Sequence, residues 1–216
     1  MPTIQHNISL KPYNTFGIDV SSNLFVEVNT VDELKSILLE NTNELLILGG
    51  GSNMLFTNNF NGLVVKNNLK GIDVIAENND EIVLKVGAGE VWHEFVMFCV
   101  EKNWSGIENL SLIPGTVGAS PMQNIGAYGV EVKDVITEVE ALNLEDFSIQ
   151  KFSNAQCEFD YRSSIFKTTQ KGKYFITSVT FQLSKKAKIN SSYGAIEDEL
   201  KSMGVINPTI KDISKA

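Results

Sequence analysis

A segment that is rich in glycine and yet apolar, residues 111–129, constrains this chain more than any other part of its sequence. It reads SLIPGTVGASPMQNIGAYG and carries few charges, whereas a solvated linker would be rich in Ser, Lys and Glu. The composition predicts irregular backbone that is buried, and the N–H and C=O groups of such backbone need partners. A large ligand is the natural partner, contacted by backbone amides and by the side chains of Ser120, Gln123 and Asn124.

Another glycine cluster lies in LILGGGSNMLF, residues 46–56, where an apolar run predicts a buried strand at residues 45–49. Its three consecutive glycines permit positive φ and a close approach of the backbone to a ligand. The N–H groups there, with the Ser52 hydroxyl and the Asn53 amide, form a nest suited to a pyrophosphate. The spacing matches neither GxGxxG nor GxxxxGK[ST], so no Rossmann or P-loop site is predicted. A tight turn without a ligand is the alternative. We call residues 46–56 the first glycine segment and residues 111–129 the second.

A single arginine stands out in EFDYRSSIFK, residues 158–167. Arg162 lies between the apolar residues Phe159 and Ile165, which predicts a guanidinium held in a partly buried site. Held in this way, it would stabilise negative charge that develops on a substrate. A surface salt bridge is the alternative interpretation.

Composition narrows the possible partners. The chain has 216 residues, with 18 Lys or Arg and 26 Asp or Glu, for a formal net charge of −8. An apolar content of 43% and a charged content of 20% are ordinary for a globular protein and exclude a disordered or collagen-like chain. The sequence pI of about 4.8, without a basic block, argues against nucleic acid or a membrane surface as partner, because both attract positive charge.

The sequence also bears on compartment and metals. No apolar run approaches the roughly 20 residues of a membrane-spanning helix, and the N-terminus lacks the basic and apolar regions of a signal peptide. We therefore expect a cytoplasmic protein. Cys99 and Cys157 lie far apart without a CxxC pattern, so neither a disulfide nor a metal site is predicted. Cys99, within FVMFCV, is expected to be a core residue.

Apolar periodicity predicts an α+β fold. A helix begins after Thr30, because Thr30 and Glu33 have the spacing of a capping box. Residues 208–216 predict the opening of a last helix with Thr209 as its cap, and the chain stops inside this pattern. Further helices are expected at residues 90–103 and 194–204, and strands at 23–29, 45–49, 63–67, 71–77, 81–89, 137–152 (a hairpin) and 173–185.

These stretches, taken in order, resemble the UDP-N-acetylenolpyruvoylglucosamine reductase family of flavoproteins. The resemblance runs from about residue 10 to the C-terminus, and IPGTVGASPMQNIGAYG followed by YRSSIF is its most specific part. The other matching segments are NTFGI, LILGGGSNMLF, VGAGEVWHEFV and GIENLSL.

The resemblance implies the FAD-binding fold of the vanillyl-alcohol oxidase and p-cresol methylhydroxylase type. FAD would bind without a covalent link between two subdomains, residues 1–67 and 68–205, and residues 206–216 would open a truncated substrate-binding domain. The pyrophosphate would contact Gly49, Gly50, Gly51, Ser52, Asn53 and Met54. The isoalloxazine and adenosine would contact Gly115, Thr116, Gly118, Ala119, Ser120, Gln123, Asn124, Ile125, Gly126 and Ala127.

The resemblance also implies an activity in peptidoglycan precursor synthesis. NADPH would reduce FAD, and reduced FAD would convert UDP-N-acetylglucosamine enolpyruvate to UDP-N-acetylmuramate. Arg162 matches the family arginine that stabilises the enolate of the substrate, and Tyr128 and Tyr193 match tyrosines that meet the substrate. The expected partner is this small nucleotide sugar, and the protein is expected to be a monomer.

The sequence departs from the family in lacking its serine proton donor and its late catalytic glutamate. His93 lies in a predicted helix and, like His6, is not a substitute for either residue. Two rival functions therefore remain, a flavin-binding module without turnover and an FAD oxidoreductase of the same fold with another substrate. A plain α+β scaffold would leave the second glycine segment without a reason.

Overall fold

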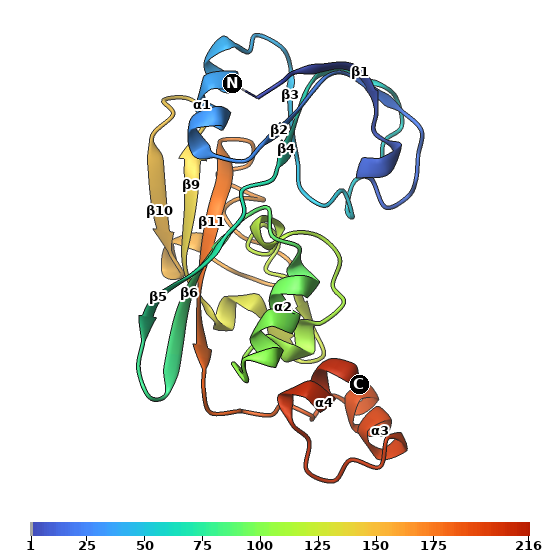
Figure 1. The fold of residues 1–216 in the computed structure, drawn as a ribbon, viewed down its shortest axis with the longest axis vertical. Coiled ribbons are helices and arrows are strands. Elements are labelled where there is room, and N and C mark those ends of the chain that lie inside the picture. The colour runs from blue at the N-terminus through green and yellow to red at the C-terminus, as the bar shows by residue number, and fades with distance from the viewer. Residues whose placement is uncertain (1) are drawn as a thin grey trace.

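A computed structural model describes residues 2–216 and arranges them around two sheets that follow one another along the long axis of the molecule (Figure 1). The smaller sheet lies at the end that carries the N-terminus, and the larger sheet forms the middle. Two short helices, α3 (Gly194–Ser202) and α4 (Ile210–Lys215), lie at the opposite end.

The smaller sheet has the strand order β1-β2-β4-β3. Its strands are β1 (Gln5–Ser9), β2 (Ser21–Val28), β3 (Leu45–Leu48) and β4 (Phe60–Asn67), and both β2 and β3 run parallel to β4. The helix α1 (Val31–Glu40) connects β2 to β3 and buries Leu34, Ile37 and Leu38 against the sheet. Thr30 is the N-cap, as predicted, because its Oγ1 accepts from Glu33 N at 3.1 Å. The full capping box is not formed, because Glu33 Oε2 accepts from Asn29 N rather than from the Thr30 amide.

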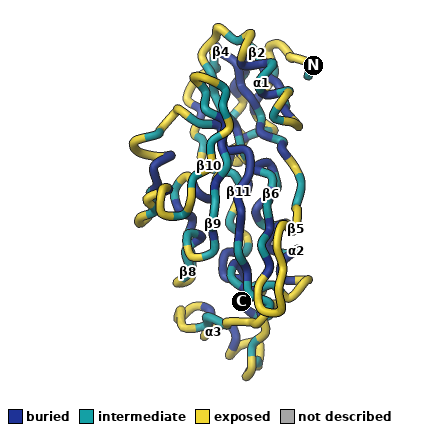
Figure 2. Tube along the Cα trace, turned by 90° about the vertical axis from the view of Figure 1, so that its left-hand side faces the viewer, coloured by how far each residue is buried: buried dark blue, intermediate teal, exposed yellow. Residues whose placement is uncertain are grey.

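The larger sheet is antiparallel throughout, with the order β10-β9-β11-β6-β5. Its strands are β5 (Ile72–Glu77), β6 (Glu81–Gly87), β9 (Ile136–Asn143), β10 (Ile149–Ser153) and β11 (Tyr174–Ser184). Burial is nearly continuous along β11, whereas buried and half-buried residues alternate along β6 and the turn between β5 and β6 is exposed (Figure 2). Asn67 links the sheets, since its Nδ2 donates to the carbonyl of Ile176 in β11 at 3.0 Å.

The second glycine segment is largely irregular, as predicted. It contains a 3-10 turn at Val117–Ala119 and the two-residue strand β7 (Gly126–Ala127), which pairs with β8 (Val130–Glu131). The helix predicted from residue 90 is α2 (Trp92–Glu101), and the last predicted helix is α4, which has Thr209 as its N-cap.

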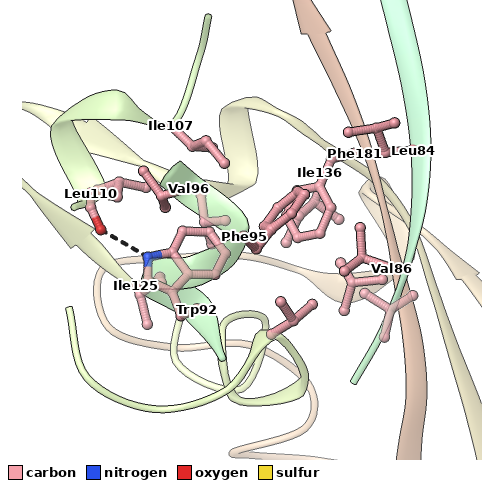
Figure 3. Packing of buried hydrophobic residues seen from close by; sticks show 14 of the residues in the cluster. Leu84, Val86, Trp92, Phe95, Val96, Ile107, Leu110, Ile125, Ile136 and Phe181 are labelled. Atoms are coloured by element: carbon pink, nitrogen blue, oxygen red, sulfur yellow. Dashed lines mark hydrogen bonds between the residues drawn. The ribbon is translucent and has the colours of Figure 1, made fainter. Parts of the chain in front are cut away.

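The helix α2 covers one face of the larger sheet through an aromatic cluster (Figure 3). The rings of Phe95 and Phe181 have centroids 5.0 Å apart, and Trp92 packs beside both. The Trp92 Nε1 group donates to the Leu110 carbonyl at 2.8 Å. This bond joins α2 to Leu110, the residue that directly precedes the second glycine segment.

Both cysteines are buried and free. Cys99 belongs to the core cluster, as expected, and burial raises its thiol pKa. Burial also raises the pKa of Cys157 to about 12, so both side chains act as small apolar groups at neutral pH.

We predict that Trp92→Phe destabilises the protein by about 2–3 kcal/mol, because it opens a small cavity and leaves the buried Leu110 carbonyl without its donor. Urea unfolding followed by far-UV circular dichroism measures the change in the free energy of unfolding. Trp104→Phe is the matched control, because Trp104 is only half-buried, and its loss should stay below about 1 kcal/mol. Equal losses for the two variants would show that the Leu110 bond contributes nothing.

Candidate functional site

The two glycine segments meet backbone to backbone. A Cβ atom added at Gly50 would lie 2.8 Å from Gly115 Cα, and one added at Gly49 would lie 2.9 Å from Thr116 Oγ1. Real Cβ atoms do not approach other atoms this closely, so the contact requires glycine at position 50. The two segments thus lie side by side, as a single ligand that contacts both would require.

A cavity of about 700 Å³ lies along this contact, within the usual range for small-molecule sites. Its wall includes Arg162 and most of the predicted cofactor residues. The cofactor residues that line it are Gly49, Gly50, Gly51, Ser52, Asn53, Met54, Gly115, Thr116, Gly118, Ala119, Ser120, Gln123, Ile125, Gly126 and Ala127.

The first glycine segment offers unpaired donors to this cavity. The backbone N–H groups of Gly50, Gly51, Ser52 and Asn53 donate to no acceptor within residues 2–216. Successive amides of this kind form an anion-binding nest, and unpaired backbone donors at a cavity wall need a ligand or water. The donor set suits a phosphate or pyrophosphate group.

The N-terminal segment supports this nest from behind. Gly51 has φ +67°, and a Cβ there would lie 1.9 Å from the Tyr13 carbonyl oxygen. The Thr15 amide donates to the Gly51 carbonyl at 3.3 Å. Asn14 is buried and fixes the local turn, because its side chain donates to the Leu10 and Ile18 carbonyls and accepts from the Ile18 amide.

Lys66 holds the first peptide of the nest. Its Nζ donates to the Gly49 carbonyl at 2.6 Å. Because C=O and N–H point in opposite directions across a trans peptide, this bond turns the Gly50 N–H away from Lys66. Burial lowers the pKa of Lys66, the Glu27 carboxylate opposes that shift, and the Lys70 ammonium adds to it. Sequence reasoning missed this residue, although a lysine inside the apolar run LVVKN was a possible signal.

The second glycine segment contributes a wall of backbone and small side chains. Gly118 packs on the residue that follows β6, since a Cβ there would lie 2.6 Å from Ala88 Cβ. Ser120 is buried and donates its hydroxyl to the Val117 carbonyl at 2.7 Å. Gln123 and Ile125 line the cavity, but Asn124 between them does not. Its side chain is fully buried behind the wall, where we expected a residue that contacts the ligand.

Arg162 reaches the cavity from an exposed turn. It lines the cavity and has φ +50°, but it is exposed, and no carboxylate of residues 2–216 lies within salt-bridge distance of it. The expectation of a partly buried guanidinium was wrong in this structure. Ile165 is buried and Phe159 packs against the core, whereas Arg162 lies near the tip of the turn between them.

Tyr128 and Tyr193 meet although they are distant in the sequence. Their ring centroids lie 5.5 Å apart in an edge-to-face arrangement, and both side chains are exposed. Neither lines the main cavity, so the pair forms a separate aromatic surface outside it.

The remaining wall comes from residues that the sequence analysis did not name as site residues. They are Ile47, Asn67, Trp92, Ile113, Pro114, Met122, Phe166, Lys167, Gln170, Gly172, Tyr174 and Ile176. Ile113, Pro114 and Met122 belong to the second glycine segment, and the others lie in strands, at the start of α2 or in loops. Residues 2–216 contain no group of three or more His, Cys, Asp or Glu placed to hold a metal ion. None of their helices is long and apolar enough to cross a membrane.

Comparison with known proteins places these features in context. Residues 22–153 match the family described as FAD binding domain. The chain is 50% identical over 215 residues to UDP-N-acetylenolpyruvoylglucosamine reductase of Flavobacterium johnsoniae. The aligned residues cover 99% of this chain and 64% of that protein. The chain thus spans less than two thirds of the length of this relative.

Solved structures with low sequence identity show the same fold. The reductase of the same name from Thermus caldophilus is 23% identical, with a TM-score of 0.71 over 97% of this chain and 73% of that one. p-Cresol methylhydroxylase is 15% identical, with a TM-score of 0.56 over 85% of this chain and 39% of that one. The predicted fold class and the family resemblance are confirmed.

We predict that Gly50→Ala weakens FAD binding at least about tenfold, or about 1.4 kcal/mol. The added methyl would collide with Gly115 Cα and separate the two segments. Titration with FAD, followed by quenching of flavin fluorescence, measures the dissociation constant. Gly194→Ala is the control, because no heavy atom lies within 4 Å of a Cβ at Gly194. An unchanged affinity in Gly50→Ala would remove this contact from the binding site.

Proposed function

This chain belongs to the FAD binding domain family, and we propose that it binds FAD non-covalently as part of an NADPH-dependent reductase of UDP-N-acetylglucosamine enolpyruvate. The product would be UDP-N-acetylmuramate, a precursor of peptidoglycan. The observation that supports the proposal best is the direct contact of the two glycine segments beside a cavity with unpaired amides.

The residues present fit the cofactor. The amides of Gly50–Asn53 supply donors for a pyrophosphate, and Lys66 adds a positive charge at the same loop. The wall of the second glycine segment is mostly backbone, methyl groups and one amide side chain, which suits a flat aromatic ring system. When bound, FAD would supply the two-electron redox chemistry that amino acid side chains lack.

The subdomain division follows the two sheets. We assign residues 1–67, which include the smaller sheet and the first glycine segment, to one FAD-binding subdomain. Residues 68–205, which include the larger sheet and the second glycine segment, form the other. The cavity then lies between subdomains, a common place for cofactor sites.

The chain's own residues would act mainly by electrostatics and positioning. Arg162 lines the cavity and has no carboxylate partner among residues 2–216, so its planar guanidinium is free to bind a carboxylate. Reduction of an enolpyruvyl group places negative charge on its carboxylate as an enolate, and Arg162 would stabilise that charge. The exposed pair Tyr128 and Tyr193 would contact the nucleotide-sugar part of the substrate.

The substrate assignment rests on the similarity to reductases of that name over nearly the whole chain. Because this reaction belongs to cell-wall precursor synthesis, the proposal places the protein in the cytoplasm, where it would act as a monomer in cell-wall biogenesis, cell shape and cell division. The partner is a small molecule, with neither nucleic acid nor membrane required.

Binding of FAD is tested directly. Protein incubated with FAD and then desalted should stay yellow, and riboflavin, which lacks the pyrophosphate, should bind at least about a hundredfold more weakly, a difference of about 2.8 kcal/mol. A colourless protein would contradict the proposal. Equal affinities for FAD and riboflavin would remove the nest of amides from the site.

We predict that Arg162→Lys slows reoxidation of the reduced flavin by UDP-N-acetylglucosamine enolpyruvate by about 10²–10³-fold, with little effect on flavin reduction by NADPH. Lysine keeps the charge but loses the planar fork that matches a carboxylate. Stopped-flow absorbance separates the two half-reactions, using the protein expressed from its complete gene. Equal losses in both would show that Arg162 supports the flavin or the fold instead.

A further inference from the structure

The turn that carries Arg162 is short and depends on few contacts. Asp160 and Ser163 exchange two backbone hydrogen bonds of 3.1 Å, which leaves Tyr161 and Arg162 at the exposed tip. The positive φ of Arg162 is a conformation that residues other than glycine adopt reluctantly. Contacts with the surrounding structure must therefore stabilise this conformation.

Asn124 makes that connection from behind the second glycine segment. Its Nδ2 donates to the Asp160 carbonyl at 3.1 Å, which is the same oxygen that closes the turn. The second Nδ2 proton goes to Glu131 Oε1 at 3.1 Å, and Oδ1 accepts from the Lys133 amide at 3.1 Å. Asn124 is 0% exposed, so these three bonds use its polar groups inside the protein rather than in the cavity.

The identity of the residue follows from its backbone and its bonds. Asn124 has φ +43°, in the left-handed region where asparagine is tolerated better than most side chains. Aspartate has the same shape but no donor, and it would face the Glu131 carboxylate. A further link joins the same segments, since Ser164 Oγ donates to the Met122 carbonyl at 2.8 Å.

We propose that Asn124 is a positioning residue that fixes the Arg162 turn to the cofactor-binding loop, and that it does not itself contact FAD. The role of Arg162 at the substrate rests on the proposed function, but the attachment of the turn does not. Because a displacement of about 1 Å at a reacting group can reduce a rate about 10²-fold, a loosened turn would slow the step in which Arg162 acts.

The test uses Asn124→Gly, because glycine keeps the positive φ and removes only the side chain. Asn124→Asp is the second variant, which keeps the shape and the acceptor for Lys133 but loses both donors. The matched control is Asn154→Ala. Asn154 also donates twice from its side chain, to the Lys133 and Ile136 carbonyls at 2.8 Å, but makes no bond to the turn.

Hydrogen exchange reports the attachment without any reaction. In FAD-loaded protein expressed from its complete gene, both Asn124 variants should speed exchange in residues 160–163 at least about tenfold, or 1.4 kcal/mol. Exchange in β6 and β11 should stay unchanged, and Asn154→Ala should leave residues 160–163 as they were. Unchanged exchange of the turn in both Asn124 variants would overturn the proposal.

Kinetics and binding then separate positioning from general damage. Asn124→Gly should slow flavin reoxidation by UDP-N-acetylglucosamine enolpyruvate at least about tenfold, while flavin reduction by NADPH and the FAD dissociation constant change less than about twofold. Combining it with Arg162→Lys should add little to the loss from Arg162→Lys alone, because both act through one group.

Additive losses, or a large fall in FAD affinity, would overturn the proposal. Should Arg162→Lys alone leave reoxidation unchanged, the proposed function would fail instead, and the exchange measurement would still decide the role of Asn124.

Discussion

The close contact between Gly50 and Gly115 is the constraint on which the rest of the site depends. It brings a loop that leaves the smaller sheet against a loop that lies over the larger one, with no side chain between them. Any larger residue at position 50 would separate the two walls of the cavity. Two further contacts hold this arrangement in place. Tyr13 packs behind Gly51, and Asn67 bonds the smaller sheet to the larger one.

An acidic protein can hold an anion here because the relevant charges are local. The net charge of −8 includes carboxylates that pair with lysines on the surface, as Glu197 does with Lys201. Screening over about 8–10 Å weakens the effect of distant charges. At the first glycine segment the field is set by unpaired amides and by Lys66, whose ammonium is bonded to Gly49. Net charge therefore excludes extended polyanions more effectively than it excludes one pyrophosphate.

Most of the strands, the helices and the glycine segments were predictable because each depends on a local pattern, whereas β1, β7 and β8 were not predicted. The N-caps of Thr30 and Thr209 were both expected from spacing and are present. The burial of Arg162 was predicted wrongly, because apolar neighbours in the sequence lie on the inner side of a turn whose tip faces outward. Lys66 was missed because its partner, the Gly49 carbonyl, is distant in the sequence and carries no side-chain signal.

The sequence by itself determined that two glycine-rich loops would exist and which side chains they offer, although the burial it predicted for the second loop holds for only part of residues 111–129. Only the tertiary structure decided which of those side chains line the cavity and which lie behind it. Gln123 and Asn124 are adjacent amides of similar chemistry, yet one lines the cavity and the other is bonded to Asp160 and Lys133. The physical reason is that the direction of a side chain in irregular backbone depends on the φ of each residue and on partners that packing brings from distant segments.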